Sequence, residues 1–96
     1  MYNTMYDKVI KLFEELGTDD PIWKYQDYRD VLEMCRLENI VILGGDIIVH
    51  KNGVYEYESS SWYYNGESVT ESITVANNYL STYPADGDTF VAYVFK

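Results

Sequence analysis

Carboxylates and aromatic rings are the side chains through which this sequence could act on a partner. From Asn52 to Phe95 the chain holds six acidic residues, seven tyrosines and one tryptophan, and no lysine, arginine or histidine. Carboxylates attract cationic partners over long distances, and tyrosine and tryptophan are enriched at protein interfaces. The composition therefore indicates a surface that binds a basic protein. The alternative is an acidic protein whose tyrosines are mostly core, because composition alone does not decide function.

The segment from Tyr55 to Glu67 is the strongest candidate for this surface. Eleven tyrosines in 96 residues exceed what a small core can bury with every hydroxyl hydrogen-bonded, so some rings must be exposed. Exposed rings among carboxylates can hold Lys or Arg side chains. For Trp62 the sequence leaves a second role open, that of a lid over the edge of the core. The predicted partner-binding residues are Asp46, Glu56, Tyr57, Glu58, Trp62, Tyr63 and Tyr64.

Motifs for catalysis, cofactors or metals are weak in this sequence. His50 is the only histidine, has no nucleophile motif beside it, and cannot make a zinc site with Cys35 alone. Gly44-Gly45-Asp46 continues into β-branched residues instead of the helix that a phosphate loop requires, so we expect a bulge there. Asp46 would either accept backbone N–H bonds in that bulge or face a partner. We expect no enzyme activity, no cofactor and no metal.

Length and charge limit the remaining classes. Ninety-six residues with 47% hydrophobic side chains predict one folded domain, residues 1–96. A net charge of −9 argues against binding to nucleic acid or anionic lipid and favours a basic protein or mimicry of nucleic acid. Cys35 cannot form an intramolecular disulfide and is expected to be buried. The absence of a secretory signal or a membrane-spanning run in these residues predicts a cytoplasmic protein.

Apolar periodicity predicts three helices. The first covers residues 3–16, and the second carries an apolar stripe from Tyr28 to Cys35 and ends before Asn39. The third covers residues 69–83, begins at a capping box formed by Ser68 and Glu71, and stops at Pro84.

Alternation and β-branched residues predict three strands. Residues 40–50 read as a central strand, and Asn52-Gly53 predicts a tight hairpin to a strand at residues 54–58. Ser59 to Ser61 are expected to form a loop, and residues 89–96 a last strand. The predicted order is ααββαβ, an α+β domain with helices packed on one face of an antiparallel sheet. Glu56 and Glu58 oppose edge pairing, which favours a monomer or a weak homodimer.

Several of these segments together resemble the small immunity proteins of bacterial polymorphic-toxin systems, and most closely the immunity protein 40 family. The likeness covers roughly residues 25–96. It rests on Leu43-Gly44-Gly45-Asp46, an aromatic Ser61-Trp62-Tyr63 segment, a helix with Ser72, Ala76, Tyr79 and Tyr83, and a hydrophobic last strand. The resemblance implies a non-enzymatic antidote that binds a cognate toxin domain and blocks it in the producing cell. The acidic, tyrosine-rich segment independently predicts that this toxin has a basic surface. Gly44, Gly45, Asp46, Trp62, Ser72 and Tyr79 match the family pattern.

Two other classes compete with this interpretation. An acidic mimic of DNA would need carboxylates spaced like phosphates along an extended face, and it would bind several unrelated basic proteins. A small enzyme would need Asp46 in a pocket beside a second titratable group, which the sequence does not supply. We rank the enzyme last.

Overall fold

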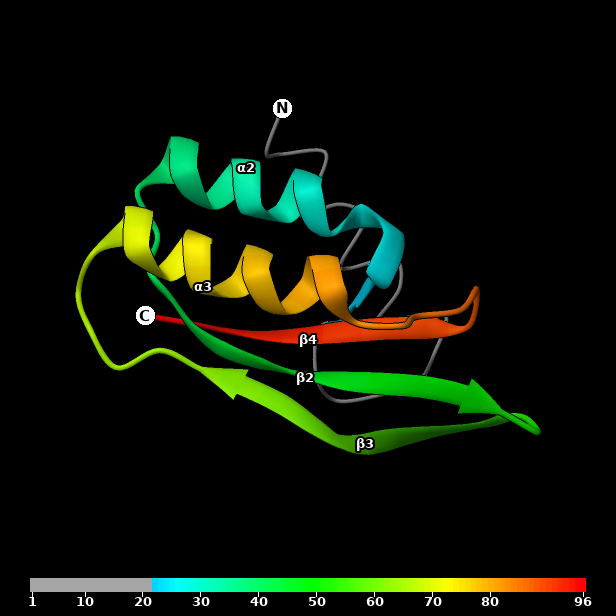
Figure 1. The fold of residues 1–96 in the computed structure, drawn as a ribbon. Coiled ribbons are helices and arrows are strands. Elements are labelled where there is room, and N and C mark those ends of the chain that lie inside the picture. Colours follow the sequence, from blue (N-terminus) through cyan, green and yellow to red (C-terminus); the bar gives the residue numbers. More distant parts are fainter. Residues whose placement is uncertain (1–21) are drawn as a thin grey trace.

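The computed structural model describes residues 22–96, which form two helices over one four-stranded sheet (Figure 1). The elements in chain order are β1 (Trp23–Lys24), a 3-10 helix η1 (Tyr25–Asp27), α2 (Tyr28–Glu38), β2 (Ile42–Lys51), β3 (Val54–Tyr63), α3 (Val69–Thr82) and β4 (Thr89–Phe95). The strands are antiparallel in the order β1-β4-β2-β3. Both helices cover the same face of the sheet (Figure 1).

The predicted α+β class, the antiparallel sheet and the one-sided helical layer are confirmed. The predicted order ααββαβ is wrong, since the described chain runs βαββαβ. Its first element is β1, which pairs with β4 through Trp23 and Lys24 only. Two residues are too few to show an alternating pattern. The helix predicted for residues 3–16 lies outside the described residues.

The main core lies between the helices and the sheet. Val31 and Cys35 of α2, Leu80 of α3 and Val91 of β4 are fully buried there. The burial predicted for Cys35 is confirmed, and desolvation raises the pKa of its thiol to about 12. None of the helices in residues 22–96 has the length and apolar character that crossing a bilayer requires.

The ends of both helices follow the predicted signals, except that at α3 the Tyr64 hydroxyl, in place of the Glu71 carboxylate, accepts the hydrogen bond from Ser68 N. The chain leaves α2 at Asn39, which takes the left-handed conformation with φ 59°. At α3 the Ser68 hydroxyl accepts a hydrogen bond from Glu71 N at 3.1 Å, as a capping box requires. Ser68 N donates to the Tyr64 hydroxyl (3.1 Å), which itself donates to Glu71 Oε1 (2.8 Å). Tyr64 therefore links the two sides of the cap.

The hairpin between β2 and β3 forms at the predicted turn, where Asn52 and Gly53 both have positive φ. The loop predicted for Ser59–Ser61 is wrong, because β3 continues to Tyr63. Between the pairs Ile48↔Tyr57 and Asp46↔Ser61, β3 has three residues and β2 has one, so a bulge in β3 absorbs the difference. The irregularity predicted near the glycines is confirmed toward β4, between Ile42 and Gly44.

Candidate partner-binding surface

β3 is an edge strand of the described sheet, paired on one side with β2 (Figure 1). It carries five of the seven predicted partner-binding residues: Glu56, Tyr57, Glu58, Trp62 and Tyr63. Asp46 lies on β2 and Tyr64 follows the end of β3. The fold therefore brings the predicted residues together along one edge of the sheet, and the strand register decides which way each side chain points.

Cross-strand pairing places three of these residues on the face turned away from the helices. Residues that pair across neighbouring strands share a face. The face bears a second cluster of buried residues, including Ile48 and Phe90, that is separate from the main core. Three rows cross it from β3 through β2 to β4: Tyr57–Ile48–Phe90, Ser61–Asp46–Ala92 and Tyr63–Gly44–Val94. Tyr57 and Tyr63 therefore flank the half-buried Asp46 on one face.

The two tyrosines on this face are exposed. Tyr57 is 56% and Tyr63 82% accessible to solvent, and Val94, across Gly44 from Tyr63, is 50% accessible. Gly44 presents no side chain between Tyr63 and Val94. This part of the sheet thus offers aromatic and aliphatic area that a partner can bury.

Trp62 points to the opposite face, under α3. Its side chain is only 8% exposed, and its ring lies 5.0 Å from that of Tyr79 and 6.1 Å from that of Tyr93, between centroids. Of the two roles that the sequence left open for Trp62, this position favours the lid over the edge of the core.

The indole of Trp62 also explains why a glycine occupies position 45. A Cβ atom on Gly45 would lie 2.4 Å from Trp62 Cη2 and 2.9 Å from the backbone oxygen of Ala92. We expect Gly45→Ala to lower the free energy of unfolding by about 1–3 kcal/mol through overpacking, as measured by urea denaturation. Gly87→Ala is the control, because its Cβ would meet no atom within 4 Å. Equal stability of the two variants would contradict the close packing of Gly45 against Trp62.

Glu56 and Glu58 lie on the helix-covered side of β3 but at its outer rim. Glu56 is exposed, and Glu58 is half-buried within the bulge. Burial, and after it the negative charge of Glu58, raise the pKa of Tyr83, the residue that caps the C-terminal end of α3. The two carboxylates therefore border the exposed edge of the sheet.

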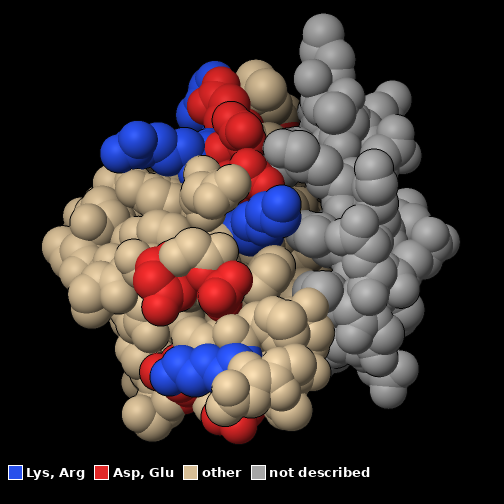
Figure 2. All heavy atoms as spheres, turned by 90° about the vertical axis from the view of Figure 1, so that its right-hand side faces the viewer, with Lys and Arg blue, Asp and Glu red and all other residues tan. Residues whose placement is uncertain are grey.

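The other acidic residues between Asn52 and Phe95 include several with contacts inside the protein. Glu67 pairs with Lys96 at 3.4 Å, and Glu71 accepts from Tyr64. Hydrogen bonds from Asp88 N and the Thr89 hydroxyl, and further the charge of Lys51, lower the pKa of Asp86. Figure 2 views the end of the molecule that bears the β2–β3 turn, and acidic and basic side chains are interspersed there. The described residues at that end therefore do not form a continuous acidic surface.

Asp46 and His50, the two side chains weighed for chemistry in the sequence, lie apart from any cluster of metal ligands in residues 22–96. Within residues 22–96, no three His, Cys, Asp or Glu side chains lie close enough together to hold a metal ion. Asp46 is half-buried on the sheet face, with Ser61 and Ala92 as its cross-strand neighbours. His50 stacks on Tyr55, with ring centroids 4.2 Å apart.

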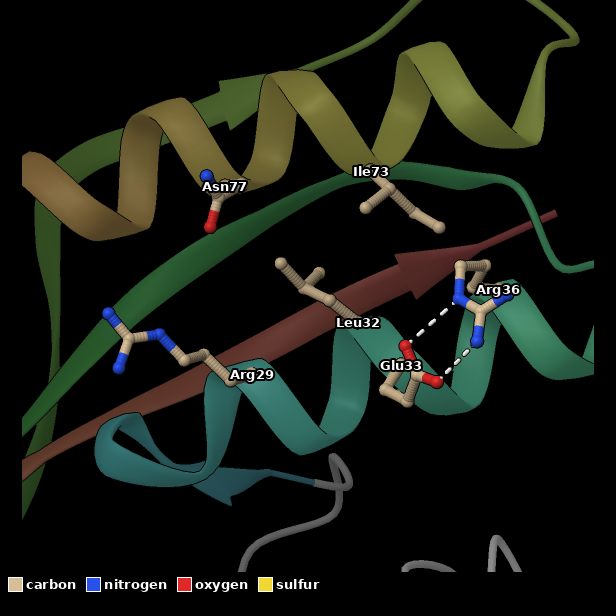
Figure 3. A pocket seen from close by; sticks show the side chains of 6 residues that line it. All are labelled: Arg29, Leu32, Glu33, Arg36, Ile73 and Asn77. Carbon is tan, nitrogen blue, oxygen red and sulfur yellow. Dashed lines mark hydrogen bonds and ion pairs between the residues drawn. The ribbon is translucent and has the colours of Figure 1, made fainter.

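A groove between α2 and α3 was not predicted from the sequence. It is lined by Arg29, Leu32, Glu33, Arg36, Ile73 and Asn77 (Figure 3). The available signal was the spacing of Arg29, Glu33 and Arg36, which places them along one side of a helix. That signal did not reveal that α3 would supply the second wall.

Comparison with known proteins supplies the family. The family model described as immunity protein 40 matches residues 12–95, which is most of the chain. The chain belongs to the immunity protein 40 family. The resemblance inferred from the sequence is thereby confirmed. Membership implies that the protein neutralises a cognate toxin and that it is not an enzyme. No curated protein and no solved structure matches this immunity protein.

Proposed function

We propose that this immunity protein binds the toxic domain of its cognate toxin and occludes it in the cytoplasm of the producing cell. The contact is made by the β3 surface, defined as Asp46, Glu56, Tyr57, Glu58 and Tyr63. Trp62 and Tyr64 support this surface, Trp62 from the core side of β3 and Tyr64 through its hydrogen bonds at the start of α3.

One observation carries this proposal. Tyr57 and Tyr63 are 56% and 82% exposed and lie on the same sheet face as Asp46, in a part of the chain without a basic residue from Asn52 to Phe95. Exposed rings next to carboxylates favour a partner that presents Lys or Arg side chains among apolar ones. A toxin that acts on nucleic acid would have such a basic cleft, because its substrate is a polyanion.

The rings and the carboxylates have different tasks in this mechanism. Tyr57 and Tyr63 lose their exposed area to the partner and supply most of the binding free energy. Glu56 and Glu58, at the rim, speed the encounter and make the association depend on salt. Occlusion is then steric, because the bound immunity protein covers the cleft of the toxin and keeps the substrate out.

The test is expression of the C-terminal domain encoded immediately upstream of this gene, alone and together with the immunity protein. We expect growth arrest by the domain alone, rescue by co-expression, and tight binding in calorimetry that weakens from low to high ionic strength. The absence of both toxicity and complex formation would contradict the proposal. Comparable binding to an unrelated basic protein would instead favour general mimicry of nucleic acid.

A further inference from the structure

The groove between α2 and α3 is lined by two arginines and one glutamate, in a protein whose net charge is −9. It holds about 220 Å³ and is lined by both of the chain's arginines, Arg29 and Arg36. Arg29 and Asn77 lie toward one end of it and Arg36 toward the other (Figure 3). Between them Leu32 and Ile73 approach each other from the two helices (Figure 3).

The two arginines are held in place before any partner binds. The Arg36 guanidinium donates two hydrogen bonds to the Glu33 carboxylate, at 2.9 and 2.5 Å. The Arg29 guanidinium lies over the Tyr28 ring, 5.5 Å from its centroid. Side chains ordered in advance lose less entropy on binding, which favours their use in recognition.

The size and lining of the groove indicate its occupant. A volume of about 220 Å³ is below the roughly 300–1,000 Å³ of clefts that enclose small-molecule ligands, so it fits one or two side chains of a protein. Its apolar centre at Leu32 and Ile73 takes an apolar side chain, while Arg29 and the Asn77 amide can donate to a carboxylate beside it. A second copy of this chain is opposed by the net charge of −9.

We infer that the groove docks an acidic segment of the cognate toxin, with an apolar side chain against Leu32 and Ile73 and a carboxylate at Arg29 and Asn77. This inference rests on the proposed function and deepens it. The toxin would be recognised by two surfaces of opposite sign, its basic region by the β3 surface and an acidic segment by the groove. Discrimination between toxins improves when each surface rejects the wrong charge.

A matched pair of substitutions in α3 tests the inference. Asn77→Asp places a carboxylate in the groove without changing its shape, and Asn78→Asp makes the same charge change at the next, also exposed, residue. A more acidic protein should associate with a basic toxin at least as fast. We therefore expect only Asn77→Asp to weaken binding of the toxin domain, by about tenfold in calorimetry, because like charges would meet in the groove. Asn78→Asp should stay within about twofold of the native protein.

A second pair uses charge reversal on the other wall. Arg29→Glu should weaken toxin binding by about thirtyfold, whereas Lys24→Glu, at an exposed residue of β1, should not weaken it. Circular dichroism melts of all four variants verify that each is folded. If the groove variants bind as tightly as their controls while the native complex forms, the groove inference is wrong and the proposed function stands. If the native protein forms no complex, the proposed function itself fails.

Sedimentation velocity of the protein without toxin tests whether a second copy of the chain occupies the groove. We expect the same sedimentation coefficient for the native protein and for Asn77→Asp, because on this inference the groove makes no contact between two copies of the chain. A dimer that Asn77→Asp dissociates would assign the groove to a second copy and overturn the inference.

Discussion

Trp62→Ala should lower the free energy of unfolding by about 3–5 kcal/mol, the range for removing a large buried aromatic side chain. The indole is 8% exposed and packs on Tyr79, Tyr93 and Gly45, so its removal leaves a cavity beneath α3. Domains of this size are stable by only about 5–15 kcal/mol, so the variant loses a large share of its stability. Urea denaturation followed by circular dichroism measures the loss.

Two further variants define what this result means. Trp62→Phe keeps a ring against Tyr79 and should cost less than Trp62→Ala, which tests the packing even if the alanine variant does not fold. Tyr63→Ala removes the adjacent ring on the exposed face and should change stability by less than about 0.5 kcal/mol. If Trp62→Ala melts like the native protein and loses only partner binding, Trp62 is an interface residue and its assignment to the core is wrong.

Local signals in the sequence were sufficient for most of the elements. Ser68 and Glu71 marked the start of α3, and Asn52-Gly53 marked the β2–β3 turn, because both signals depend on backbone groups within a few residues. The burial of Cys35 followed from its place on the apolar side of a helix. Such features need no knowledge of distant parts of the chain.

Elements that depend on distant contacts were missed. β1 is two residues long and exists because β4 pairs with it. The three serines after Glu58 have a polar composition that predicts a loop, yet they continue β3. Ser60 hydrogen-bonds the Tyr79 hydroxyl on α3, and a bulge accommodates the extra residues opposite β2. No pattern within the strand itself encodes either contact.

Alternation within residues 54–58 set Tyr57 apart from Glu56 and Glu58, but the loop predicted for Ser59–Ser61 left the faces of Trp62 and Tyr63 undecided. The bulge adds two residues relative to β2, which preserves the alternation, so Tyr57 and Tyr63 stay on one face and Trp62 on the other. Glu56 and Glu58 lie on the same face as Trp62, although charged side chains are seldom buried. The helices nevertheless cover that face, and the carboxylates remain at the rim because β3 is an edge strand.

Tyr63→Ala should weaken binding of the toxin domain about thirtyfold, since truncating a central interface ring costs about 2 kcal/mol or more. Tyr63 is 82% exposed beside Gly44 and Val94, so the protein should melt at nearly its native temperature. Calorimetry on the purified toxin domain measures the affinity, and the melting curve confirms that the fold is intact.

The dependence of this loss on salt separates the ring from the carboxylates around it. Tyr63→Ala should reduce affinity by the same factor at low and high ionic strength, because burial of an uncharged ring is not screened. Glu56→Gln should slow association and flatten the salt dependence, because Glu56 is an exposed carboxylate at the rim. Tyr63→Phe keeps the ring and should bind nearly as tightly as the native protein. Unchanged affinity in both Tyr63→Ala and Tyr57→Ala would place the toxin contact elsewhere on the molecule. Loss of affinity in both variants, with the fold intact, would make the exposed face of β3 a centre of recognition.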